Sequence, residues 1–487
     1  MIITAYSQAV AAGALQLWVG LLDTEQPVAP TFRIDGAERA PSSVVAPLAP
    51  IRDRAVGRGG TPLNHRGIFR FDGLQPGRPY RVEITVGDSR QELFTQTLPQ
   101  VLPQLLESSF NILLCSCYCQ PEDQSGLLGT IVAQIKRQPN LTLLLGDQVY
   151  LDLPLLEDLP EDEPALSQRI GEKYKRNWAS TAFGGAGLQS LLARAPVVCI
   201  PDDHEFWNNY PFQQKQLPNT WRDAVRTRWA DAAQALYEDY QLAGAAAAGS
   251  TRIDVDPLKI LCVDLRCDRD AEFQRLMQDG TAVALQRWVD DLIAAKEAGR
   301  PAVGVLASGQ ALFIDPPVDD SQKRSVDAEM GNYQQFKVIL AALDSLADRA
   351  IPVLYLTGDV HWGRVAEGVD LRSTRTLLYE VICSPSRLIR VPVVDAAKEK
   401  WNAAKGIFGH GDPWPRHSAP EPVPARFGSN RRFALRGSFE QRGDQVAILS
   451  FARCGGGVEF QVSYYAIHPD KAVAQSRSTE RYQLRIF

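Results

Sequence analysis

Apolar and polar positions follow two different periods along the chain. Over residues 1–104 they alternate in short segments, such as 16–19 and 68–71, which Gly and Pro residues separate. This two-residue period is typical of β-strands with one buried face. From residue 111 onward, short apolar runs alternate with segments in which apolar residues recur every three or four positions. The pattern therefore predicts an all-β unit followed by an α/β domain.

The length of the chain supports this division, since 487 residues exceed what one ordinary hydrophobic core organises. We predict a first domain over residues 1–104 and a second over residues 105–487. In the first, a Pro-Gly turn at residues 76–77 precedes a strand that contains Tyr80. This arrangement resembles a fibronectin-III or immunoglobulin-like sandwich. The alternative is that these strands belong to the larger domain.

The second domain contains apolar runs of strand length and amphipathic segments of helix length. The expected strands are 112–114, 141–145, 197–200, 260–263, 303–306 and 353–356, and the expected helices include 127–135, 224–240, 284–298 and 336–346. Segments 446–451 and 458–465 return to the two-residue period, which predicts that this part of the sheet is antiparallel. Residues 384–432 are rich in Pro and Gly, include His410, Trp414 and His417, and predict a long loop.

Short polar clusters follow four of the expected strands, at the carboxyl edge where open α/β sheets bind ligands. They are Ser116-Cys117, the segment from Gly146 to Asp152, the segment from Asp202 to Glu205, and the segment from Gly358 to Gly363. Each has an ordinary explanation if taken alone, such as a buried thiol, a turn, a packed aromatic ring or a helix cap. Together they supply thiolate, carboxylate, phenolate and imidazole groups, which predicts a metal site.

The order of these clusters resembles the calcineurin-like metallophosphoesterases, in which Asp-x-His, Gly-Asp-x-x-Asp, Gly-Asn-His-Glu and Gly-His-x-His motifs follow successive strands. Several motif members are substituted here, and the substitutions resemble the PhoD-like alkaline phosphatases. Further similar segments are 208–210, 263–266, 286–288 and 380–385. The resemblance covers residues 111 to about 385. It implies a two-sheet αββα metallophosphoesterase domain, so that the whole chain is an α/β protein preceded by the all-β sandwich.

The resemblance implies two metal ions about 3.5–4 Å apart, with Asp147 as the bridging ligand. The first ion would be bound by Asp147 together with Cys117, Tyr150 and His361. The thiolate and phenolate are strong anionic donors that favour Fe(III), as does a likeness of Asp-x-x-Tyr to the purple acid phosphatases. Zn is the second choice, because Cys, His and Asp also suit it. The second ion would be bound by oxygen donors only, namely Asp147, Asp203, Asp359 and Asn209. Oxygen donors favour Ca, Mg or Mn, and the resemblance implies Ca.

The expected reaction is hydrolysis of phosphate monoesters or diesters by a hydroxide that the two metals activate. His204 corresponds to the family's histidine that assists the leaving group. Arg266 and Arg269 follow a strand and are candidate phosphate contacts, because guanidinium groups match phosphate oxygens. The alternative is that these arginines form surface ion pairs with Asp264 or Asp268.

Composition narrows the range of partners and compartments. The net charge is −5 and no Lys/Arg cluster stands out, so a small-molecule phosphate ester is a more suitable partner than nucleic acid. Neither a membrane span nor a signal peptide is evident, which predicts a cytoplasmic protein. Among the eight cysteines, three lie in apolar runs as core residues, whereas Cys115, Cys117 and Cys119 alternate at a strand end, where thiols chelate or react.

Two other classes of function are compatible with the same residues. A thiol hydrolase would use Cys117 as nucleophile and His204 as base, but it leaves Asp147 and Asp359 without a role. A non-catalytic binding protein would use the metal only to stabilise its fold. Removal of metal separates the first alternative from a metalloenzyme, and turnover of an aryl phosphate separates the second.

Overall fold

The computed structural model describes residues 1–154, 157, 159–242, 249–313, 330–388, 423–424, 432–468 and 474–486. Most of the predicted loop at 384–432, including His410, Trp414 and His417, lies outside the described residues.

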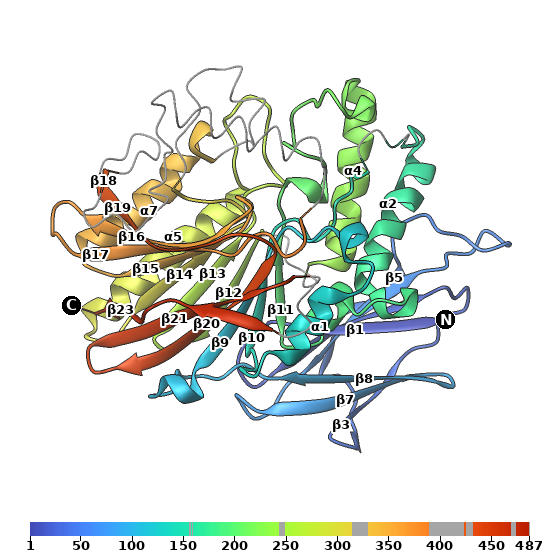
Figure 1. Cartoon of the computed structure of the whole chain (residues 1–487). Coiled ribbons are helices and arrows are strands. Elements are labelled where there is room, and N and C mark those ends of the chain that lie inside the picture. The colour runs from blue at the N-terminus through green and yellow to red at the C-terminus, as the bar shows by residue number, and fades with distance from the viewer. Residues whose placement is uncertain are drawn as a thin grey trace.

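Two large β-sheets pack face to face and helices cover their outer faces (Figure 1). The first sheet has the spatial order β22 (Gln475–Ser478), β21 (Gly457–Ala466), β20 (Gln445–Cys454), β9 (Phe110–Cys115), β10 (Leu141–Leu145), β11 (Val197–Ile200), β1 (Ile2–Gln8), β2 (Leu15–Leu22), β6 (His65–Phe71) and β5 (Ser43–Pro50), and β23 (Tyr482–Arg485) also pairs with β21. The second sheet has the order β12 (Ser250–Val255), β13 (Leu258–Val263), β14 (Val303–Ala307), β15 (Val353–Thr357), β17 (Thr376–Ile382), β16 (Gly363–Asp370), β19 (Phe433–Gln441) and β18 (Val423–Pro424).

The space between the two sheets is filled by apolar side chains that point inward from alternate strand positions. Ile112 and Leu143 from the first sheet belong to the same buried cluster as Ile260, Val305 and Leu354 from the second. β9, β10 and β11 are parallel neighbours, as are β13, β14 and β15. β20 pairs antiparallel with both β9 and β21, so the predicted antiparallel C-terminal part is confirmed.

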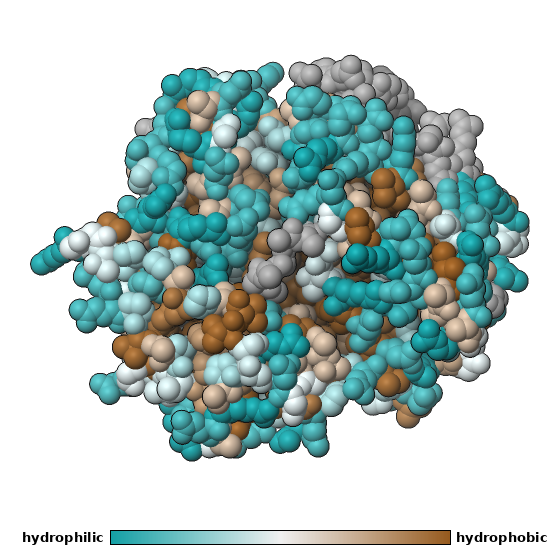
Figure 2. Space-filling model, turned by 180° about the vertical axis from the view of Figure 1, so that it is seen from behind, coloured by the Kyte–Doolittle hydropathy of each residue, from teal (hydrophilic) through white to brown (hydrophobic). Residues whose placement is uncertain are grey.

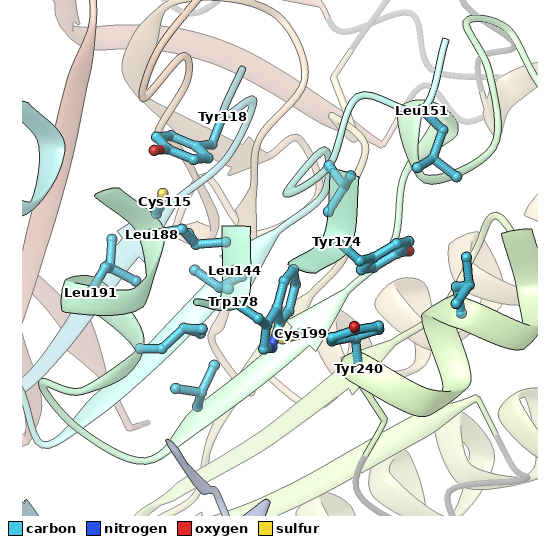
Figure 3. Close-up of a cluster of buried hydrophobic side chains, with 14 of the residues drawn as sticks. Cys115, Tyr118, Leu144, Leu151, Tyr174, Trp178, Leu188, Leu191, Cys199 and Tyr240 are labelled. Atoms are coloured by element: carbon cyan, nitrogen blue, oxygen red, sulfur yellow. The ribbon is translucent and has the colours of Figure 1, made fainter. Parts of the chain in front are cut away.

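The outer face of the first sheet carries α1 (Leu127–Gln134), α2 (Glu163–Trp178), α3 (Gly187–Leu192) and α4 (Asp223–Tyr240). Figure 3 shows the core beneath them, where Trp178 of α2 and Tyr240 of α4 lie over strand residues such as Cys199. The rings of Trp178 and Tyr240 meet edge to face with centroids 5.6 Å apart. α5 (Asp279–Glu297) and α7 (Phe336–Asp348) pack on the second sheet. This is the predicted αββα arrangement.

α2 and α3 are additional to the helices that the sequence pattern predicts. α2 carries an apolar stripe at Leu166, Ile170, Tyr174 and Trp178, all buried and spaced by four residues. This spacing places the four side chains on one helix face. α3 has only six residues, which is too short for a helical period to be recognised.

We expect Trp178→Ala to lower the free energy of unfolding by about 3–5 kcal/mol, because it removes a fully buried ring from the core beneath α2 and α4. Urea denaturation would measure the loss. Trp178→Phe is the matched control, since it keeps an aromatic ring and the indole N–H has no hydrogen-bond partner in the described structure. A loss as large in Trp178→Phe as in Trp178→Ala would contradict a packing role.

The N-terminal strands form a sandwich of which one sheet continues the first large sheet. β1, β2, β6 and β5 face a four-stranded sheet of order β4 (Ala37–Glu38), β3 (Thr31–Ile34), β7 (Pro79–Val86) and β8 (Ser89–Gln96). β1 runs parallel to β11, and the Ala9 N–H donates to the Val197 carbonyl at 2.9 Å. At the predicted turn, the Gln75 N–H donates to the Tyr80 hydroxyl at 2.8 Å. The fold class is confirmed as α/β with a β-sandwich, whereas a domain boundary at residue 104 stays a prediction.

The surface is mainly hydrophilic on the face shown in Figure 2, with small hydrophobic patches in its lower half. Isolated exposed apolar residues of this kind are normal on protein surfaces. Among the described helices, none combines the length and the apolar character that are needed to cross a bilayer.

Candidate metal centre

The strand ends of the two sheets approach one another at a single edge. β9, β10 and β11 end just before the first three polar clusters, and β15 of the other sheet ends just before Asp359. Gly358 makes this approach possible, since a Cβ at this position would lie 2.4 Å from the Ser116 Cβ and 2.5 Å from the Leu145 carbonyl oxygen. Only glycine fits at such a distance. The fourth polar cluster is thereby brought beside the first two.

The polypeptide backbone is in the left-handed region at many of the predicted ligands. The φ angles are 52° at Cys117, 57° at Asp147, 62° at Asn209, 65° at Asp359 and 57° at His361. For non-glycine residues this conformation costs about 1–2 kcal/mol each. Residues in such conformations concentrate at functional sites, where the surrounding fold holds them in place.

Carboxylate groups from three strand ends converge on Asp147. Donor atoms of Asp147, Asp203 and His204 all lie within 4.8 Å of one another, and so do those of Asp147, Asp202 and Asp359. Asp147 belongs to both groups, which is the position that a bridging ligand requires. Its carboxylate also accepts a hydrogen bond from the His204 backbone N–H at 3.2 Å.

The Ser384 hydroxyl links Cys117 to the backbone of His361 at the edge of the centre. The Cys117 sulfur lies 3.4 Å from the Asp147 carboxylate and accepts a hydrogen bond from the Ser384 hydroxyl at 3.1 Å. The backbone N–H of His361 donates to the same hydroxyl at 3.3 Å. The His361 side chain is exposed, and its imidazole belongs to neither of the two donor groups found among the described residues.

Tyr150 and Asn209 each hold a polar atom without a hydrogen-bond partner in the described structure. Tyr150 is 5% exposed, and its hydroxyl makes no hydrogen bond. The side-chain oxygen of Asn209 is also unpartnered, although its backbone N–H donates to Asp203 at 2.6 Å. Buried polar atoms normally have partners, so these two are expected to meet a ligand.

His204 is held between an aromatic ring and a carboxylate. Its ring stacks on Tyr150 with centroids 4.1 Å apart, and its Nδ1 lies 2.8 Å from the Asp152 carboxylate. The other Asp152 oxygen accepts a hydrogen bond from the Asn208 N–H at 2.9 Å. Nδ1 is therefore engaged, and Nε2 is the nitrogen left for a substrate.

Glu205 and Asp202 organise the loops around the centre. The Glu205 carboxylate accepts hydrogen bonds from the backbone N–H groups of Asp147, Gln148 and Asp202 at 2.6–2.9 Å. Asp202 accepts a 2.6 Å hydrogen bond from Arg266 Nε. Arg266 is 1% exposed and its Nη1 donates to the Tyr210 carbonyl, so its ion pair is buried with Asp202 instead of lying on the surface with Asp264 or Asp268.

The sequence of this region matches a known family. Residues 110–272, which include the first three polar clusters and Arg266, match the family model of the PhoD-like phosphatases. Within these residues the chain is similar to the PhoD-like phosphatases. The resemblance that the motifs indicate is thereby confirmed, and it supports the hydrolysis of phosphate esters.

Solved structures give the fold of the remainder. A structure of PhoD is similar to this chain over 99% of its length and 90% of the PhoD chain, with 14% sequence identity and a TM-score of 0.59. A carbohydrate acetylesterase from Xanthomonas citri (11% identity, 99% and 100% coverage, TM-score 0.20) and an amylomaltase from Corynebacterium glutamicum (12% identity, 74% and 48% coverage, TM-score 0.14) are too dissimilar to inform the fold. The search of curated proteins found no match.

The candidate metal centre concentrates negative charge in a buried place. Burial raises the pKa of Asp147 well above its ordinary value, and the nearby Asp203, Asp202 and Glu205 carboxylates raise it further. Burial likewise raises the pKa of Glu205, to about 7. For His204, burial lowers the pKa, but Asp152 and the other carboxylates outweigh this effect and hold it well above its usual range. At Asp147 these neighbours favour the neutral carboxyl group, and a bound cation would favour the ionised form.

The donor set of this site fits metal ions. Its carboxylates converge within 4.8 Å, and the unpartnered Tyr150 hydroxyl and Asn209 oxygen lie in the same loops. One oxygen of Asp202 is also buried without a hydrogen-bond partner in the described residues. Bound cations would satisfy these oxygen atoms and neutralise the clustered charge.

Four residues of the candidate metal centre are additional to the predicted set, namely Asp152, Asp202, Glu205 and Ser384. Asp202 and Glu205 flank Asp203 and His204, and the sequence alone does not distinguish a ligand from a supporting carboxylate in such a run. Asp152 belongs to the polar cluster after β10 that also contains Asp147. This shared cluster is the feature of the sequence that indicates a role for Asp152 in the site. Ser384 lies 267 residues from Cys117, and although segment 380–385 resembles the family, nothing in the sequence indicates its contact with Cys117.

Proposed function

We propose that the protein hydrolyses phosphate esters at a two-metal centre built around Asp147. The observation that carries this proposal is the convergence of Asp203, His204, Asp202 and Asp359 on the Asp147 carboxylate. The PhoD-like sequence of residues 110–272 supports the same reaction class. Turnover of a panel of phosphate monoesters and diesters, with metal analysis of the same preparation, tests the proposal. Absence of turnover with every ester would contradict it.

The two ions would have different donors. Cys117, Tyr150 and His361 would hold the first together with Asp147, and we propose Fe(III) there, with Zn as the alternative. Asp203, Asn209 and Asp359 would hold the second together with Asp147, and we propose Ca, with Mn or Mg as alternatives. When bound, the two cations supply an activated water and neutralise the charge that develops on the phosphoryl group.

His204 would act on the leaving group. Its ring is fixed by Tyr150 on one face and by Asp152 at Nδ1, so Nε2 is positioned to give a proton to the departing oxygen. Asp152 would act as a positioning residue, because it orients the ring and stabilises the charged imidazole. The Asp152 carboxylate, which lies 2.8 Å from Nδ1, raises the pKa of His204 and so favours the protonated ring that a general acid requires.

Arg266 would stabilise the site mainly through Asp202. Its Nε and Nη1 already donate to Asp202 and to the Tyr210 carbonyl, so a phosphate contact would use its remaining N–H groups. Arg269 is buried, its Nε donates to the Leu265 carbonyl at 2.7 Å, and its guanidinium lies over the Tyr333 ring. A phosphate contact by either arginine stays a prediction.

A thiol hydrolase is disfavoured by the surroundings of Cys117. An active thiol needs a lowered pKa and a nearby base. Burial raises the pKa of Cys117 well above its ordinary value, and the Asp147 and Asp359 carboxylates raise it further. The partner of His204 at Nδ1 is Asp152 instead of Cys117. A thiolate at this position instead requires a neighbouring cation.

Tyr150→Phe is expected to bleach or shift a visible absorption band of the iron-replete protein while leaving the fold intact. The unperturbed pKa of a phenol is about 10, and burial raises that of Tyr150 further, so only a strongly polarising cation would hold it ionised. Absorption spectra of wild-type and variant protein, each with measured iron content, provide the test. A colourless iron-replete wild type, or an unchanged band in Tyr150→Phe, would remove the phenolate assignment.

A further inference from the structure

A cavity of about 270 Å³ shares the side chain of Tyr150 with the candidate metal centre. Tyr150 forms part of its wall, together with Val149 and Leu153 from the loop after β10. The same Tyr150 ring stacks on His204. The volume lies just below the range of about 300–1,000 Å³ for small-molecule pockets, so the cavity suits part of a substrate and not a large ligand.

A further part of the cavity wall is one face of α2. Arg169, Lys173 and Arg176 are spaced by four and three residues along this helix and therefore project from the same side. The Glu157 carboxylate forms ion pairs with both Arg169 and Lys173, and Lys173 Nζ lies 2.7 Å from it. Two of the three cations thus share one carboxylate.

Arg176 is the cation of this wall that has no carboxylate partner in the described structure. It is exposed, and its guanidinium lies 5.8 Å from the centre of the Phe183 ring. Glu172, the acidic residue of the cavity wall, lies 3.7 Å from Lys175, which also pairs with Asp23. Arg176 is therefore available to an anionic group in the cavity.

Asn177 adds a second unsatisfied group to the same wall. It is 2% exposed, and its Nδ2 donates to the Gln148 carbonyl at 2.7 Å, which fixes the orientation of the amide. Its Oδ1 has no hydrogen-bond partner in the described residues. Asn177 thus ties α2 to the loop after β10, where Tyr150 lies.

We propose that this cavity, the Tyr150–α2 cavity, receives the leaving group of the ester and favours leaving groups that carry a second anionic group, which Arg176 contacts. The inference rests on the proposed function, because it places the leaving group beside His204. The apolar wall at Val149 and Leu153 would cover the body of the group, and the guanidinium would bind its acidic end.

The test compares the kcat/KM values for phenyl phosphate and 4-carboxyphenyl phosphate, or for their methyl diesters if only diesters are hydrolysed. The specificity ratio is the kcat/KM for the carboxylated ester divided by that for the plain ester. We expect Arg176→Gln to lower this ratio by about fivefold relative to wild type, which corresponds to the contribution of a partly exposed charge pair. Arg176→Glu should lower it further, because it adds repulsion. Dividing the ratio of each variant by that of the wild type cancels the difference in intrinsic reactivity between the two leaving groups.

Arg300→Gln and Arg300→Glu are the matched controls, since Arg300 is exposed and lies outside both the site and the cavity. Their ratios should equal that of the wild type. Turnover with an unchanged ratio in both Arg176 variants would overturn the subsite alone. Absence of turnover by wild-type protein with all four esters would overturn the proposed function and the subsite with it.

Discussion

Asp147→Asn is expected to lose both metals together and to abolish turnover. Asp147 belongs to both groups of converging donor atoms, and an amide at this position supplies no negative charge to two cations. Loss of a group that only supports a ligand already lowers metal affinity or activity about 10- to 100-fold, so loss of the shared ligand should exceed that range. Metal content per chain and phosphate ester turnover, measured on one preparation, give both quantities.

Asp231→Asn is the matched control for this variant, because it makes the same chemical change at an exposed position of α4. It should retain metal and activity. Thermal unfolding of both variants separates metal loss from misfolding. If Asp147→Asn kept its full metal content and its activity, the centre would lie elsewhere.

His204→Ala is expected to lower kcat by about 10²-fold or more while the metal content stays near that of the wild type. General acids contribute about 10²- to 10⁴-fold to a reaction, and His204 is oriented for this role by Tyr150 and Asp152. Steady-state kinetics with an ester of a poor leaving group would show the largest effect, because such a group depends most on a proton. An ester of a good leaving group serves as the comparison.

Asp152→Asn should give a smaller decrease in kcat in the same direction, since it removes the orienting carboxylate but keeps the imidazole. The two variants should also share the dependence on leaving group. Loss of a whole metal equivalent in His204→Ala would instead make His204 a ligand together with Asp147 and Asp203, whose donor atoms lie within 4.8 Å of its ring nitrogen.

The sequence predicts those residues of the site that lie directly after strands. Asp147, Asp203 and Asp359 each follow an apolar run of strand length, and the common edge of a sheet is enough to expect them together. The left-handed backbone conformation of Asp147 and Asp359 is indicated only weakly in the sequence, by the glycines Gly146 and Gly358 that precede them. The resemblance to the PhoD-like phosphatases follows from the order of the same clusters.

The sequence does not predict the contacts that hold the metal-site residues in place, because these contacts join segments far apart in the chain. Ser384 reaches Cys117 across 267 residues, and Arg266 pairs with Asp202 across 64. The continuity of the sandwich with the large sheet likewise depends on one pairing, between Gln8 of β1 and Val197 of β11. Local periodicity predicts each strand but not its neighbour, so the sandwich resembles a separate unit in the sequence although its strands extend the sheet.

Removal and restoration of metal tests the central claim most directly. Purified protein would be treated with a chelator, freed of it, and assayed on an aryl phosphate monoester and diester before and after addition of iron, calcium, zinc, manganese or magnesium. The two-metal account predicts that turnover of at least one ester disappears with the metals and returns when suitable ions are supplied. Turnover that persists at its full rate in protein shown by analysis to contain no metal would contradict it.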